Sequence, residues 1–157
     1  MSVTEVHEER ETLSVDVLLP GHEARVTTPL FTHTRKLLEE REGGRCFVCG
    51  CTAEEVGPLE AHHHPVERSF AEMIDFGPSS RLRRDFPGFD WAAFDAAGGD
   101  PYQFVDDMRV NGLLLCKAHH TGKDEGIHDL PFPIWIAQRY GREGYRFSGA
   151  EVLHHEG

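Results

Sequence analysis

Two short motifs far apart in the chain constrain its fold more than any other feature. The first is Cys46-x2-Cys49 and the second is Cys116-x2-His119. A gap of two residues lets both side chains of one turn reach the same ion, and zinc prefers four tetrahedral thiolate and imidazole ligands. We therefore expect a Cys3His structural zinc site that joins the beginning of a domain to its end. The alternative is a set of buried free thiols beside an unrelated histidine.

The remaining cysteine, Cys51, could replace Cys49 as a ligand, but its spacing from Cys46 makes a poorer knuckle. We expect Cys51 to be an ordinary small side chain, and we expect Gly50 to provide a tight turn after the first motif. Three cysteines crowded into residues 46–51 are more typical of metal binding in a cytosolic protein than of a secreted disulfide framework.

Composition narrows the class of protein. Of 157 residues, 39% are hydrophobic and ten are Phe, which is enough for a packed core. The formal net charge of −11 argues against a protein that coats nucleic acid by bulk positive charge, although a bound metal and a small basic surface can set a local field. No apolar run approaches the ~20 residues that span a membrane, and the acidic start lacks the features of a signal peptide. We expect a cytoplasmic protein.

The hydrophobic pattern predicts a mixture of short helices and strands. A helix is expected over Pro29–Arg41, with Thr32 or Thr34 as its N-cap and Gly43–Gly44 after its end. The aromatic residues Trp91, Phe94, Trp135 and Tyr140 are expected in the core. Strands are predicted at residues 12–19, 23–27, 59–63 and 110–116, helices at 89–97 and 101–108, an amphipathic segment at 132–140, and a final element at 145–153.

A second constellation involves histidines. His62 and His63 end a short predicted strand before a turn at Pro65, and His120 directly follows the second knuckle. Neighbouring strand residues point to opposite faces, so one histidine is suited to bind a metal while the other faces outward to act on water. The alternative is that the run of histidines is merely exposed and polar.

The sequence CFVCG … LEAHHHP … NGLLLCKAHHTGK resembles the zinc-knuckle-bearing HNH endonucleases over about residues 45–128. The resemblance implies an α+β fold with a ββα-metal core, in which two strands and a helix hold one divalent ion. It also implies a role for each of four residues: His62 and His120 as metal ligands, His63 as the general base, and Asn111 as the residue that ties the loop and orients His63.

The chain departs from the family pattern in three ways. The second knuckle ends in His119 instead of Cys, which zinc accepts equally well. Residues 64–110 form an insertion longer than the usual loop. The third ligand of the ion is open between Asp124, His128 and water, because Gly122 and Gly126 each disfavour a long regular helix after His120 by about 1 kcal/mol relative to Ala.

We therefore expect an N-terminal extension of strands and a helix (1–44), an HNH domain (45–130) and a C-terminal packing segment (131–157). The implied function is metal-dependent hydrolysis of DNA by a phage or prokaryotic protein in the cytoplasm, with Mg²⁺, Mn²⁺, Ni²⁺ or Zn²⁺ in the catalytic site beside the structural zinc. The alternative is a non-catalytic zinc module that binds DNA or a protein partner, for example in phage packaging. An acidic adaptor that mimics DNA is a third, weaker reading.

Several basic residues are candidates for contact with DNA phosphates, because arginine binds phosphate with two parallel hydrogen bonds. A run of charge is more often a solvated face, and this alternative stays open. The candidates are Arg81, Arg83, Arg84, Lys117 and Lys123, followed by Arg139, Arg142 and Arg146.

Overall fold

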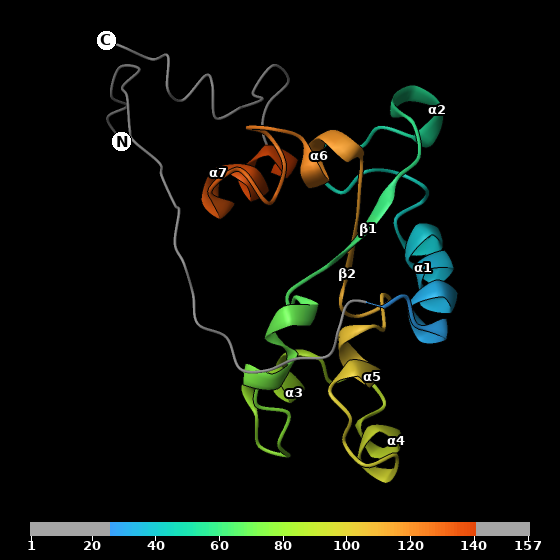
Figure 1. Ribbon diagram of the computed structural model, residues 1–157, viewed down its shortest axis with the longest axis vertical. Helices are drawn as coiled ribbons and strands as arrows, with labels where there is room; N and C mark the ends of the chain where they lie inside the picture. The colour runs from blue at the N-terminus through green and yellow to red at the C-terminus, as the bar shows by residue number, and fades with distance from the viewer. Residues whose placement is uncertain (1–25, 141–157) are drawn as a thin grey trace. The chain divides into compact units, whose positions relative to one another are not determined.

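The computed structural model describes residues 26–140 of the chain. It is a small mixed structure of helices and strands with one two-stranded antiparallel sheet, consistent with the α+β class. The described residues divide into two compact units. We call residues 45–60 and 115–140 the knuckle unit, and residues 26–44 and 61–114 the helical unit. Figure 1 shows the elements of each unit.

The first helix, α1, spans Pro29–Arg41, as the sequence predicts. Its N-cap is Thr28, so the predicted cap at Thr32 or Thr34 is wrong. The Thr28 hydroxyl accepts a hydrogen bond from the Phe31 N–H at 3.1 Å, and proline follows at the first helical position, where its missing N–H costs nothing. Thr34 instead lies buried inside the helix, and Leu38 beside it is also fully buried.

The two strands are β1, Glu60–His63, and β2, Gly112–Leu115. Both lie within the predicted strand segments and are shorter than expected. All four residues of β2 are buried, whereas in β1 only His62 is. His62 therefore lies on the covered side of β1 and His63 on the more exposed side, as the alternation of side chains along a strand requires.

Four short elements follow β1 in the helical unit: η1 (Arg68–Met73), α3 (Arg81–Asp85), α4 (Trp91–Ala96) and α5 (Tyr102–Val105). In Figure 1, α4 and α5 follow one another along the lower part of this unit. Their apolar residues form one cluster in which Trp91 stacks on Phe104 with ring centroids 5.6 Å apart. The predicted insertion thus contains its own aromatic core, and Trp91 and Phe94 belong to it.

The knuckle unit contains α2 (Ala53–Val56), α6 (Lys117–Thr121), α7 (Phe132–Ala137) and η2 (Gln138–Tyr140). Helices α6 and α7 lie side by side (Figure 1), and the indole N–H of Trp135 donates to the carbonyl of His119 at 3.0 Å. Trp135 is fully buried, as predicted for a core residue. Tyr140 is 79% exposed, so its predicted core position is wrong.

Several predictions fall on residues that the structure does not describe. They are the strand at 12–19, most of the strand at 23–27, the final element at 145–153, Arg142 and Arg146. Val26 and Thr27, the described end of the second of these strands, have no strand geometry. Between residues 26 and 140, no helix has the length and apolar character required to cross a membrane.

Candidate functional site

The two cysteine motifs meet in the knuckle unit. Ligand atoms of Cys46, Cys49, Cys116 and His119 all lie within 4.8 Å of one another. The Sγ atoms of Cys49 and Cys116 are 3.9 Å apart, and His119 Nδ1 lies 3.2 Å from Cys116 Sγ and 4.0 Å from Cys46 Sγ. Tetrahedral zinc would set about 3.8 Å between two sulfurs and about 3.6 Å between sulfur and nitrogen. The four side chains therefore fit a zinc ion, and the cluster could hold one.

Local backbone geometry brings each half of this cluster together. The Gly50 N–H donates to the Cys46 carbonyl at 2.9 Å, and Gly50 has φ +73°, a left-handed conformation that glycine adopts without strain. Cys116 is the N-cap of α6, so it and His119 occupy the same first turn. Cys51 lies outside the group of four described ligands; its thiol donates to the Cys49 carbonyl at 4.0 Å.

The thiols of the cluster differ in pKa. Burial acts to raise the pKa of Cys46, but hydrogen bonds from His119 and surrounding backbone groups lower it to about 6. Burial raises the pKa of Cys49 and Cys116 above that of an ordinary thiol, with a contribution from the charge of the Cys46 thiolate. Without a metal, the pocket therefore favours the thiolate form of Cys46 alone. A bound cation would stabilise the thiolate form of all three cysteines.

Two further histidines, one near the end of α6 and one in the segment that follows it, lie near one another in the knuckle unit. The rings of His120 and His128 have centroids 5.3 Å apart. Helix α6 ends at Thr121 and the chain turns at Gly122, where any Cβ would collide with the backbone of Ala118. This early end fits the prediction that the glycines stop a long helix, and it lets the chain return to bring His128 back beside His120.

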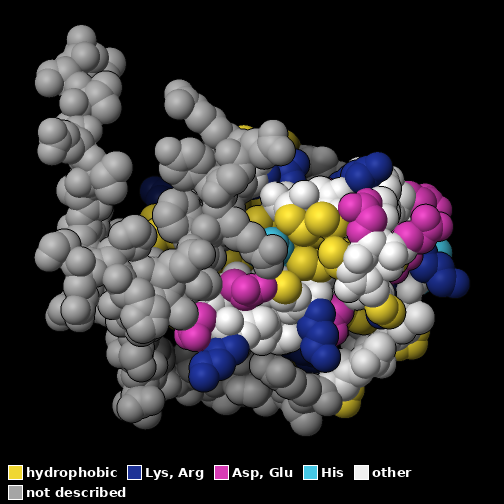
Figure 2. Space-filling view, turned by 90° about the horizontal axis from the view of Figure 1, so that it is seen from above, with side chains coloured by type: hydrophobic (Ala, Val, Ile, Leu, Met, Phe, Trp, Pro, Cys, Tyr) yellow, Lys and Arg dark blue, Asp and Glu magenta, His cyan; other side chains and the backbone are white. Residues whose placement is uncertain are grey.

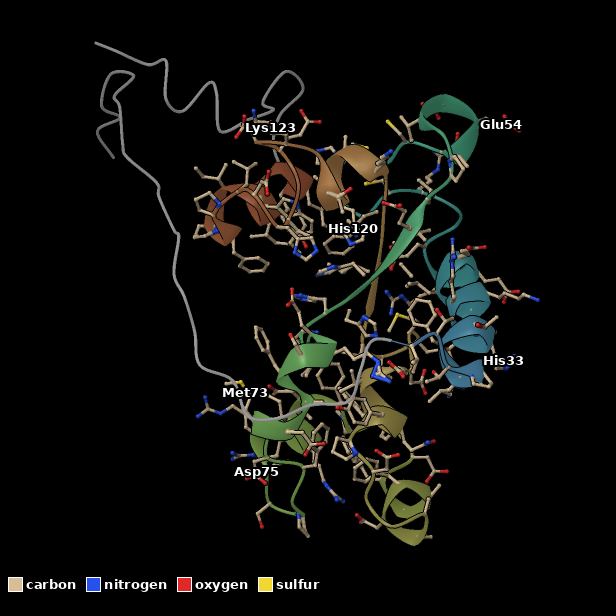
Figure 3. All side chains as sticks on the ribbon, viewed as in Figure 1. His33, Glu54, Met73, Asp75, His120 and Lys123 are labelled. Atoms are coloured by element: carbon tan, nitrogen blue, oxygen red, sulfur yellow. The ribbon has the colours of Figure 1, made fainter. Side chains whose placement is uncertain are left out.

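A carboxylate holds His120. Its Nδ1 lies 3.1 Å from Oε1 of Glu60, the first residue of β1. The bond leaves Nε2 as the nitrogen suited to a metal ligand, an arrangement common among metal-binding histidines. Figure 3 shows His120 below the α6 segment and Lys123 above it. His62, the other predicted ligand, belongs to the helical unit, whereas His120 and His128 belong to the knuckle unit.

In the helical unit, His63 pairs with a residue that the sequence did not single out. Its Nε2 lies 3.1 Å from Oδ1 of Asp106, and its ring stacks on Phe31 with centroids 5.5 Å apart. The Asp106 side chain is only 2% exposed, against 21% for His63. The histidine is thus held by a buried carboxylate on one edge and by an aromatic ring on one face.

Asn111 is fully buried and links two parts of the helical unit's backbone. Its Oδ1 accepts from the Val66 N–H at 2.9 Å, and its Nδ2 donates to the carbonyls of Val66 and Val105, both at 2.8 Å. Val105 immediately precedes Asp106, and the carbonyl of Asn111 accepts from the His64 N–H at 3.2 Å. The amide therefore fixes the backbone on either side of the His63–Asp106 pair.

The basic residues proposed for DNA contact occupy different environments. Arg83 binds Asp95 through Nη1 and Nη2 of its guanidinium, at 2.9 and 2.6 Å, and the pair raises the pKa of Arg83 and lowers that of Asp95. Arg139 lies over the Phe47 ring, 3.7 Å from its centroid, and bonds the Phe47 carbonyl. Arg139 is exposed to solvent, as are Arg81, Arg84, Lys117 and Lys123.

Charge on the face shown in Figure 2 is mixed. On the face in Figure 2, Lys and Arg side chains lie scattered among Asp and Glu side chains. Contact with an anion on that face would therefore depend on individual side chains.

Comparison with known proteins gives no relative: no family model, curated protein or solved structure matches the chain.

Proposed function

We propose that this protein is a metal-dependent HNH-type endonuclease that hydrolyses DNA phosphodiester bonds. The observation that carries the proposal is the His63–Asp106 pair, in which a partly exposed imidazole at the end of β1 is held by a buried carboxylate. This is the arrangement of a general base whose ring is oriented by a third group. The order β1, β2, α6 agrees with the strand–strand–helix order that the resemblance implies.

In the proposed reaction, His63 takes a proton from a water molecule. The water oxygen then forms a bond to phosphorus while the bond from phosphorus to the 3′ oxygen breaks, and the leaving 3′ oxygen takes a proton from solvent. Asn111 fixes the backbone at Val66 and Val105, and so holds the general base His63 in place. Arg81, Arg84, Lys117 and Lys123 are the side chains proposed to contact DNA phosphates.

The proposed ligands of the catalytic ion are His62, His120 and His128. The donor set suits a divalent metal, since neutral imidazole is a common ligand for such ions. When bound, a divalent ion would supply Lewis-acid stabilisation of the charge that develops on the phosphate oxygens. The zinc proposed at Cys46, Cys49, Cys116 and His119 has a structural role.

The test is cleavage of supercoiled plasmid by the full chain with Mg²⁺, Mn²⁺, Ni²⁺ or Zn²⁺ supplied separately. His63→Ala should lower the metal-dependent rate by about 10²- to 10⁴-fold, whereas His33→Ala, on the exposed side of α1 (Figure 3), should leave it unchanged. Metal-dependent cleavage that survives in His63→Ala rules out this mechanism. DNA binding without cleavage under any of the four ions favours the non-catalytic zinc module, for which the net charge of −11 is the only present support.

A further inference from the structure

Asp106 is buried in the helical unit, and both of its carboxylate oxygens lie beside polar partners. It follows α5 directly, and its Oδ2 accepts the Thr28 hydroxyl at 3.0 Å and lies 3.5 Å from Nη2 of Arg68. Its own carbonyl accepts the Thr34 hydroxyl at 3.1 Å. A buried carboxylate persists when charge and hydrogen bonds compensate for lost water, and these contacts provide that compensation without His63.

The second oxygen, Oδ1, is therefore available for His63. An ionised carboxylate only accepts hydrogen bonds, so the proton between the two groups belongs to Nε2 of the imidazole. In a neutral ring, the proton on Nε2 leaves the lone pair on Nδ1. Within residues 26–140, Nδ1 of His63 has no hydrogen-bond partner.

The orientation of the carboxylate is fixed as well as that of the ring. Arg68 lies over the Tyr102 ring, 4.4 Å from its centroid, and is itself 93% buried. With Arg68 and Thr28 on Oδ2, rotation of the Asp106 carboxylate away from His63 would break contacts with both. The ring of His63 in turn cannot rotate freely, since Phe31 covers one of its faces.

We infer that Asp106 is a positioning residue that holds His63 as its Nε2–H tautomer and so presents the Nδ1 lone pair as the proton acceptor. The inference rests on the proposed function for its catalytic consequence, but the tautomer itself does not depend on the reaction. Asp106 does not touch the reacting atoms; it acts through His63.

Asp106→Asn is the sharpest test. The Thr28 hydroxyl donates to the Oδ2 position and the positive charge of Arg68 lies 3.5 Å from it, so the new amide should place its oxygen there and its NH2 group toward His63. An NH2 donor facing Nε2 requires the lone pair on Nε2, which moves the ring proton to Nδ1. In the Ser-His-Asp triad of serine proteases, an aspartate-to-asparagine change that produces the wrong histidine tautomer lowers kcat by about 10⁴-fold.

Asp107→Asn is the matched control. Asp107 is equally buried and is paired with Arg109 at 2.7 Å, and it makes no contact with His63 among the described residues. It should lose stability without changing the His63 tautomer or kcat. Asp106→Asn should lower kcat by about 10²-fold or more, with little change in KM for plasmid DNA.

The tautomer is read from the ring nitrogen shifts of ¹⁵N-labelled full-length protein at alkaline pH, with His63 assigned by His63→Ala. Nε2–H in the wild type and Nδ1–H in Asp106→Asn support the inference. Nδ1–H in the wild type, or the same tautomer in both proteins, overturns it even if the wild type cleaves DNA. A wild type that cleaves no DNA removes the proposed function, while the tautomer measurement still decides whether Asp106 positions the ring.

Discussion

Glu60 Oε1 lies 3.1 Å from Nδ1 of His120, so the first residue of β1 holds a histidine at the end of α6. Loss of such an outer carboxylate lowers metal affinity by about 10- to 100-fold in other proteins. Glu60→Ala should therefore weaken Mn²⁺ binding at the proposed catalytic site by a factor in this range, measured by titration followed by electron paramagnetic resonance. Glu54→Ala, an exposed residue of α2 (Figure 3), is the control. Equal Mn²⁺ affinities in Glu60→Ala and Glu54→Ala would show that Glu60 does not support metal binding.

Cys116→Ser should remove zinc from the knuckle unit. Structural zinc contributes about 10–16 kcal/mol of apparent binding free energy in zinc-finger peptides, which is comparable with the whole stability of a typical domain, about 5–15 kcal/mol. The zinc content of the variant by elemental analysis should fall by one ion per chain, with lower Tm and solubility, and Cys46→Ser should behave alike. Cys51→Ser should retain one zinc per chain, because Cys51 lies outside the cluster. Full zinc content in Cys116→Ser would contradict the site.

Zinc affinity should rise with pH. Burial raises the pKa of Cys49 and Cys116, so both thiols carry protons near neutrality without metal, whereas the pKa of Cys46 is lowered to about 6. Binding must then displace two protons, and affinity should increase by up to about 100-fold per pH unit above the pKa of Cys46. Competition with a chromogenic chelator at a series of pH values measures this. An affinity that does not vary with pH would mean that the thiols are already deprotonated.

The three arginines of α3 should respond differently to replacement. Arg81→Ala and Arg84→Ala should weaken binding of a DNA duplex and each reduce the slope of log affinity against log salt by about one. Arg83→Ala should chiefly lower Tm, because Arg83 binds Asp95 and lies over the Trp91 ring. Fluorescence anisotropy across a salt series, with thermal unfolding of each variant, distinguishes the two effects. Unchanged anisotropy in the first two variants would exclude them from the DNA surface.

The metal cluster could be predicted from the sequence because each pair of ligands is defined by residues close together in the chain. Each knuckle places two ligands within one turn, so spacing alone predicted that Cys46 pairs with Cys49 and Cys116 with His119. The helix Pro29–Arg41 was predicted with its correct bounds for a similar reason. Its cap was wrong because Thr28, directly before Pro29, satisfies the first turn.

The partners of the histidines were not predictable from spacing. Asp106 lies 43 positions from His63, and Glu60 lies 60 positions from His120. Acidic residues are common in this chain, and only the packing of the fold selects which of them meets an imidazole. The short elements α2, η1 and α3 were missed in the same way, because helices of four to six residues depend on tertiary contacts more than on propensity.

The separation of the two knuckles has a consequence for how the chain can change over evolutionary time. The chain between Cys49 and Cys116 forms one long connection that begins and ends at the cluster, and two local turns position the four ligands of that cluster. The entropic cost of closing such a connection rises by only about 0.6 kcal/mol when its length doubles. Segments of this connection could therefore be added, shortened or exchanged while the four ligands keep their places. The exposed surface of the connection is thus free to diversify toward new targets.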